Sequence, residues 1–360
     1  MKKTIALVLG LLLCLTAATA AAGDAGDPLI SLSYLEGEFA RSLEAAFAGR
    51  LDASDAAIRA GREQNAAGPT EEAGGLREHT LKRGDALSGS TGLAVAPLSG
   101  QIRLETAAGA VVDVTNGTEA PAGQILLVHH RYIVAENARA VFTVESPAAV
   151  LSWEGGGTLQ YSTEPDYYAI ALALRKLDLF QGSGSGIGEG FDLHLAPTRG
   201  EALVMFLRVL GEEDQALACT DSHPFTDVPG WLDRYVAWAY ARGYANGVAP
   251  DRFGCGQTVS AVEYEEFLLR ALGYSAAGVD DYATSLERGL TCGALTGGEY
   301  AMLRGEEFLR AHVAYISYYT LDVPVSGSRQ TLAQRLAAGG HMTAEQLTDA
   351  RALVGSLRIT

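Results

Sequence analysis

Between Leu76 and Gly157 apolar and polar positions alternate, so the pattern repeats every two residues instead of the 3.6 residues of a helix. Short runs rich in β-branched and aromatic residues are separated by turn signals such as Asn116-Gly117. Several short strands at close spacing predict a small antiparallel β sandwich or barrel. The expected strands cover residues 101–105, 110–114, 124–128, 132–134, 140–145 and 150–153.

Helical spacing dominates on both sides of that region. Upstream, an Ala-, Leu- and Glu-rich stretch from residue 27 to 64 predicts a helical leader, and residues 65–75 have the composition of a linker. Downstream, amphipathic segments predict helices over 167–179, 231–245 and 282–290, and a helical tail over 332–357 that is interrupted at Gly339-Gly340. The fold class is therefore predicted as α+β.

Three similar thirteen-residue windows recur in the second half of the chain, at 198–210, 260–272 and 303–315. An internal repeat of this kind indicates a repeated architecture and favours a repeated binding surface over a catalytic centre. A glycine that could close a helix in the left-handed conformation follows each upstream helical stretch: Gly182, Gly247 and Gly293.

The first two windows begin with a capping box, the motif in which Ser or Thr precedes a helix and Glu follows three residues later. Thr198 pairs with Glu201 in this way, and Ser260 pairs with Glu263. The third window keeps the glutamate but has Leu303 at the cap position. We therefore expect a helix to begin at each window.

Arg199 and Arg304 occupy the same position in the first and third windows, and Ala261 replaces them in the second. An arginine beside the free amides of a helix N-terminus favours a carboxylate or phosphate there. A surface salt bridge is the alternative, and the spacing alone does not decide between the two.

One stretch of the chain resembles the S-layer homology domain of bacterial surface proteins. The matching residues are Phe225-Thr226-Asp227-Val228, Trp231, Tyr235-Val236, Gly243, Gly247 and Phe253, with Thr198-Arg199-Gly200-Glu201 and Arg304-Gly305-Glu306 matching the arginine motif of that domain in the other two repeats. The resemblance covers about residues 165–318.

That resemblance implies a largely helical, pseudo-threefold bundle of three repeats that binds a secondary cell-wall polysaccharide carrying pyruvyl groups. It implies that Arg199 and Arg304 hold the pyruvyl carboxylate and that Asp227 and Trp231 line a groove. Trp231 as a core side chain is the alternative. Because Ala261 replaces the motif arginine, one or two of the three grooves are expected to be silent.

The N-terminus predicts export. Basic residues 1–3, an apolar run over 5–15 and small residues over 17–22 have the order of a secretory signal. No later stretch approaches the about 20 apolar residues that a membrane-spanning helix needs. The formal net charge of −16 makes nucleic acid and anionic membrane surfaces poor partners.

Cys219, Cys255 and Cys292 follow the predicted signal. An odd number leaves at least one thiol unpaired, and Cys219 with Cys255 is the pair to expect if a disulfide forms. Reduced, buried thiols are the alternative. No spacing of His and Cys suggests a metal site.

Enzyme chemistry has little support in the sequence, which contains no P-loop and no HExxH motif. His129-His130 lies in a strand-like run, where neighbours face opposite sides, so the two are not expected to share a metal. The adjacent carboxylates Glu265-Glu266 and Asp280-Asp281 are expected to be solvated. We therefore expect no catalytic residue, no metal and no cofactor.

The sequence thus predicts a non-catalytic, exported protein at the cell wall or cell surface, which binds a peptidoglycan-linked polysaccharide through its repeats and displays a β domain. An exported wall hydrolase that uses the repeats for targeting is the alternative. The expected parts are a signal peptide (1–22), a helical leader and linker (23–75), a β-rich domain (76–160), repeats at 165–217, 224–274 and 280–318, and a helical tail (319–360).

Overall fold

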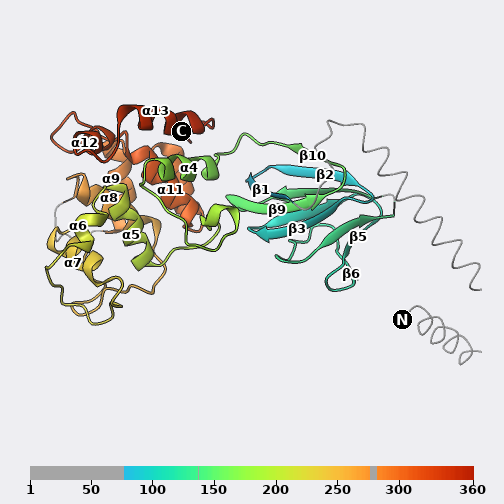
Figure 1. Cartoon of the computed structure of the whole chain (residues 1–360), viewed down its shortest axis with the longest axis horizontal. Coiled ribbons are helices and arrows are strands. Elements are labelled where there is room, and N and C mark those ends of the chain that lie inside the picture. Colours follow the sequence, from blue (N-terminus) through green and yellow to red (C-terminus); the bar gives the residue numbers. More distant parts are fainter. Residues whose placement is uncertain (1–76, 137, 276–281) are drawn as a thin grey trace, which may run out of the picture. The chain divides into compact units, whose positions relative to one another are not determined.

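The computed structural model describes residues 77–136, 138–275 and 282–360 (Figure 1). The expected signal peptide (1–22) and the helical leader with its linker (23–75) lie outside the described residues, as do Asp280 and Asp281. No helix among the described residues has the length and apolar character needed to cross a bilayer.

The β region is built from two antiparallel sheets, which confirms the predicted class of this part of the chain. The first sheet has six strands in the order β1-β9-β3-β7-β5-β6, and the second has four in the order β10-β2-β8-β4. The strands are β1 (Arg77–Lys82), β2 (Ala86–Ser90), β3 (Ala94–Ser99), β4 (Ile102–Thr106), β5 (Ala110–Asp113), β6 (Thr118–Glu119), β7 (Tyr132–Ala135), β8 (Arg139–Val144), β9 (Ala148–Glu154) and β10 (Gly157–Gln160).

Alternation of side chains builds the core between the sheets. Ile102 and Leu104 of β4 are fully buried, whereas Arg103 between them faces outward, because successive side chains of a strand point to opposite faces. Phe142 of β8 lies opposite Leu104 in the register and belongs to the same core. Burial of these apolar side chains provides the main driving force for the sandwich.

Two sequence expectations for the β region have different outcomes. Asn116-Gly117 forms the turn between the paired strands β5 and β6, with Gly117 at φ 72°, so the predicted hairpin is confirmed. The strand expected over 124–128 is wrong, because this segment forms only one isolated bridge, from Ile125 to Arg103. It closes the open edge of β4 without extending the sheet.

Helices follow from residue 167 to residue 353, so the α+β class is confirmed (Figure 1). They are α4 (Tyr167–Lys176), α5 (Arg199–Val209), α6 (Glu213–Leu217), α7 (Asp233–Ala241), α8 (Ala261–Ala271), α9 (Ser285–Cys292), α10 (Gly297–Gly305), α11 (Arg310–Thr320), α12 (Leu332–Ala338) and α13 (Ala344–Leu353), with 3-10 turns η2 (Gly188–Gly190) and η3 (Tyr282–Thr284).

Helices α5, α8 and α11 each have eleven residues and begin after an extended cap residue. The two predicted capping boxes are confirmed: the N–H groups of Thr198 and Ser260 donate to Glu201 and Glu263 at 2.8 Å each. The third expectation is wrong, because α11 begins at Arg310, six residues after Arg304. These three helices share one apolar core with α4, which packs on α11.

Only one of the three glycines expected to close a helix does so. Gly293 caps α9 at φ 79°, whereas Gly182 and Gly247 do not have positive φ. Gly243, at φ 67°, follows α7 instead. Gly247 is needed for close packing, since a Cβ there would lie 2.3 Å from the ring of Phe225.

Candidate functional site

Arg199, the first expected anion-binding residue, is 2% exposed. Its Nη1 donates to Glu263 Oε1 at 2.6 Å and its Nη2 to the carbonyl oxygen of Asn246 at 2.9 Å. The guanidinium lies 5.1 and 5.2 Å from the ring centroids of Phe253 and Phe267. Both terminal nitrogens of the Arg199 guanidinium are therefore engaged by another part of the helical bundle.

The backbone amides at the start of α5 are occupied as well. The N–H of Arg199 donates to the oxygen of Gln257 at 2.7 Å, and the N–H of Gly200 donates to the oxygen of Cys255 at 3.0 Å. An anion at a helix N-terminus needs such amides free. The loop before α8 fills that position.

Arg304 does not begin a helix, since it lies in the last turn of α10. Its side chain is 62% exposed, donates to the hydroxyl of Tyr300 at 2.6 Å and lies 3.9 Å from Glu287. Arg304 therefore forms a surface salt bridge with Glu287, which was the alternative to an anion site. The position is solvent-accessible, so Arg304 can still reach a ligand.

Arg310 is the structural counterpart of Arg199, and the sequence reasoning missed it. It is the first residue of α11, it is 6% exposed, and its Nε donates to the oxygen of Phe191 at 2.9 Å. Burial lowers its pKa below the ordinary value of an arginine. Its own N–H donates to Leu195 O at 2.8 Å, so this helix start is also filled by protein.

Asp227 holds a loop together. Its two carboxylate oxygens accept the N–H groups of Phe253 and Gly254 at 2.7 and 2.8 Å. Burial raises the pKa of Asp227, but these hydrogen bonds outweigh burial and keep the pKa below its ordinary value. The carboxylate is therefore ionised and already engaged.

Trp231 is at the surface, two residues before α7, and it is 61% exposed. The alternative of a core tryptophan is therefore wrong. Its indole presents an apolar face and an N–H donor to solvent, the combination that suits a sugar ring. Of the four expected ligand residues, Trp231 and Arg304 are accessible and Arg199 and Asp227 are engaged in the fold.

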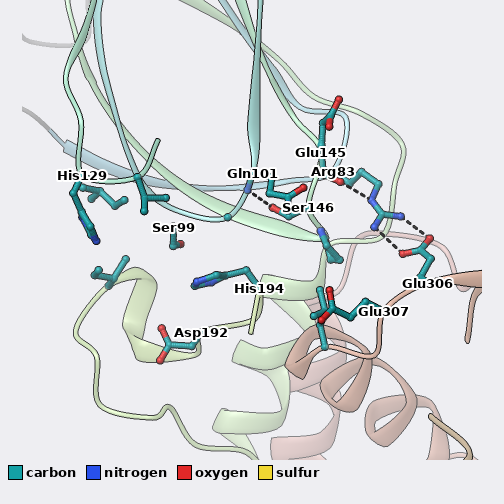
Figure 2. A pocket seen from close by; sticks show the side chains of 16 residues that line it. Arg83, Ser99, Gln101, His129, Glu145, Ser146, Asp192, His194, Glu306 and Glu307 are labelled. Carbon is teal, nitrogen blue, oxygen red and sulfur yellow. Dashed lines mark hydrogen bonds and ion pairs between the residues drawn. The ribbon is translucent and has the colours of Figure 1, made fainter. Parts of the chain in front are cut away.

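A separate cleft of about 620 Å³ opens between the loops of the sandwich and those of the helical region (Figure 2). Gln101, Ser99 and His129 come from the sandwich, and His194 and Asp192 come from the segment before α5. A volume of this size is typical of sites for small ligands. The lining also includes Arg83, Leu98, Gly100, Val128, Glu145, Ser146, Pro147, Ile187, Glu306, Glu307 and Leu309.

Two carboxylates of this cleft are neutralised by arginine. Glu145 forms an ion pair with Arg103, which holds its pKa below the ordinary range. Glu306 accepts two hydrogen bonds of 2.7 Å from Arg83 (Figure 2). Contact with His312 and then with Arg83 lowers the pKa of Glu306 to about 2. A general acid needs a raised pKa, so neither group is suited to that role.

The two adjacent histidines do not lie in a strand, contrary to expectation, because residues 128 and 129 form a turn. His130 Nδ1 lies 2.8 Å from Asp113 Oδ2, and His129 lines the cleft. Among the described residues no three His, Cys, Asp or Glu side chains are grouped so as to hold a metal ion.

Cys219, Cys255 and Cys292 are all free, so the pairing of Cys219 with Cys255 does not occur. The thiol of Cys255 instead donates to the carbonyl oxygen of Asp227 at 2.9 Å. The alternative of reduced, buried thiols fits only in part, because the three thiols are unpaired but each cysteine is partly exposed.

Comparison with known proteins does not extend this picture. No protein-family model matches the chain, and a search of curated proteins also returned no match.

Proposed function

We propose that this chain is an exported, non-catalytic binding protein whose helical repeats attach it to a cell-wall polysaccharide. Three features support the proposal: the resemblance of residues 165–318 to the S-layer homology domain, the shared geometry of α5, α8 and α11, and the accessible indole of Trp231. In this proposal the β sandwich is the part displayed at the wall.

The exposed side chain of Trp231 carries the proposal. An indole that is 61% exposed leaves apolar surface in water, and covering that surface with a sugar ring recovers free energy. Asp227 lies four residues away and fixes the neighbouring loop through Phe253 and Gly254. We assign ligand contact to Trp231 and Arg304, and a supporting role to Arg199 and Asp227.

A wall hydrolase has less support. That reaction needs a carboxylic acid that stays protonated until it donates its proton. In the cleft Glu145 and Glu306 have lowered pKa values because each is paired with an arginine. The arrangement therefore favours binding over hydrolysis.

Trp231→Ala is expected to weaken binding to purified sacculi about tenfold, which equals about 1.4 kcal/mol, because the sugar loses its apolar platform. Cosedimentation of the purified mature chain with sacculi, with and without their secondary polymer, measures the affinity. The unmutated chain should sediment only while the polymer is present.

Tyr161→Ala is the matched control, since Tyr161 is an aromatic residue that is 76% exposed and follows the sandwich. It should leave sedimentation unchanged. Equal sedimentation of the Trp231 variant and the unmutated chain would remove Trp231 from the proposed contact. Sedimentation that survives removal of the polymer would contradict polysaccharide binding.

A further inference from the structure

Ser99 is a polar side chain in the cleft with no partner inside the protein. It is 7% exposed, and among the described residues its hydroxyl forms no hydrogen bond. Figure 2 shows it in the wall of the cleft, between His129 and His194. Its hydroxyl oxygen is not one of the buried atoms left without a partner, so it is accessible from the cleft and available to a polar ligand there.

Irregular backbone surrounds Ser99. The register of β3 shifts between Pro97 and Ser99, which marks a bulge, and bulges redirect side chains beside functional sites. His129 has φ 64° and is fixed by a 2.7 Å hydrogen bond from its N–H to the oxygen of Pro97. Asp192, on the opposite wall, has φ 49°. Strained residues of this kind concentrate at ligand sites.

Two carboxylates of the cleft, Asp192 and Glu307, form no ion pair with a described residue, although the charge of Arg310 acts on Asp192 from farther away. Asp192 accepts hydrogen bonds from the hydroxyls of Ser183 and Ser185, the latter at 2.8 Å, but no described cation lies within ion-pair distance. Glu307 is exposed and has no ion-pair partner among the described residues either. Both line the cleft, so a cationic ligand is favoured there.

His194 adds no positive charge to balance them. Burial lowers the pKa of His194 below its ordinary value, since the half-buried ring loses solvation when it is charged. A neutral imidazole has one nitrogen that accepts a hydrogen bond. Asp192 and Glu307 thus provide charge, and His194 and Ser99 provide acceptors.

The remaining wall is apolar. Leu98 and Val128 line the sandwich side, and Ile187 lines the helical side. Apolar walls beside two carboxylates suit an alkyl chain that ends in an ammonium group, because the chain packs on the walls while the charge meets the carboxylates.

We propose that this cleft binds a primary ammonium group on an alkyl chain, either a lysine side chain of a peptide or a polyamine. Asp192 and Glu307 neutralise the ammonium, and Ser99 and His194 accept its hydrogen bonds. The site is separate from Trp231, so it does not depend on the proposed attachment to polysaccharide.

Calorimetric titration of the full chain with tri-lysine and, separately, with spermidine tests this proposal. Binding of either probe supports it and identifies the source of the ammonium. Tri-lysine acetylated at every Nζ should bind at least tenfold more weakly, because acetylation removes the charge. If neither cationic probe binds, the proposal is overturned.

Glu307→Gln and Ser99→Ala should each weaken the binding of the cationic probe. Glu307 is exposed, so its replacement should not disturb folding. Glu345→Gln makes the same substitution at an exposed position on α13 and should leave affinity unchanged. Equal affinity of the Glu307, Glu345 and unmutated proteins would show that the probe responds only to the net charge of −16, which also overturns the proposal.

Discussion

Arg199→Ala is expected to lower the free energy of unfolding by about 3 kcal/mol, at the low end of the range for breaking a buried ion pair. The variant removes the 2.6 Å hydrogen bond to Glu263 and the 2.9 Å hydrogen bond to the oxygen of Asn246. It also removes the cation that lies near the rings of Phe253 and Phe267. The loss stays near the lower limit because the Glu263 side chain is 24% exposed and is partly resolvated. Equilibrium urea unfolding measures it.

Arg304→Ala is the matched control, since it makes the same chemical change where the side chain is 62% exposed. Its ion pair with Glu287 is long and solvated, so the expected change is within about 0.5 kcal/mol. Equal losses in the two variants would show that Arg199 is not the internal support we describe. A double-mutant cycle of Arg199→Ala with Glu263→Gln would then isolate the pair.

Because Arg199 is expected to stabilise the fold, its variants are unsuitable for testing wall binding. Loss of sedimentation in an Arg199 variant would report unfolding of the helical region, because the guanidinium joins α5 to Glu263 of α8. Trp231 and Arg304 are exposed, so their variants separate contact with ligand from stability.

The alternating pattern predicted the strands in which β-branched and aromatic residues occupy the core face. β8, with Phe142 and Val144 on its buried face, is an example. β2 was missed because its sequence, Ala-Leu-Ser-Gly-Ser, has one large apolar residue, and β3 was missed because it contains Pro97, which is atypical of strands. Both strands depend on distant partners, which a local pattern does not reveal: β3 pairs with β9 and β7, and β2 with β8 and β10.

Helix starts were predictable where side chains cap them. Thr198 with Glu201 marked α5, whereas α11 follows Leu309, and His312 replaces the glutamate. The imidazole Nδ1 of His312 accepts the N–H of Leu309 at 3.0 Å, so the same bond is made by an unexpected residue. Arg310, and not Arg304, is therefore the residue equivalent to Arg199, and the third repeat begins six residues later than the sequence window indicated.

The ion pair of Arg199 with Glu263 could not be predicted, because the two residues are 64 positions apart in the sequence. The capping box also accounted for the Glu263 carboxylate without any further partner. The same limitation applies to Glu265-Glu266, which were expected to be solvated. That expectation is wrong, since α8 is covered on nearly all sides and the two glutamates are 1% and 0% exposed. Glu266 forms ion pairs with Arg270 and Arg288.

Glu265 is buried without compensation. Neither of its carboxylate oxygens has a hydrogen-bond partner. Its side chain fits against Gly289 of α9, where a Cβ would lie 2.5 Å from Oε1. Burial, with a smaller contribution from the nearby carboxylates Glu299 and Glu266 and with Arg358 opposing them, raises the pKa of Glu265 to about 8. The carboxyl group is therefore protonated at neutral pH.

The variant Glu265→Gln tests how the raised pKa of Glu265 changes stability with pH. Glu345→Gln, at an exposed position on α13, is the control for the titration of other groups. At pH 5 the glutamine resembles the protonated acid, so the unmutated chain and the Glu265 variant should have similar unfolding free energies apart from a constant offset. The Glu345 control should follow the unmutated chain at every pH, because an exposed carboxyl has similar surroundings in both states.

Above pH 5 the two proteins should diverge. The pKa of Glu265 rises from an ordinary 4.5 to about 8 on folding, so the folded state binds more protons between these values. The stability that this proton provides is complete below about pH 4.5 and is lost as the pH rises towards 8, by up to about 1.4 kcal/mol per pH unit. Glu265→Gln should remove this loss and make the protein more stable than the unmutated chain at pH 9. Urea unfolding at several pH values measures the difference, and parallel profiles from pH 5 to pH 9 would show that Glu265 is ionised in the folded protein.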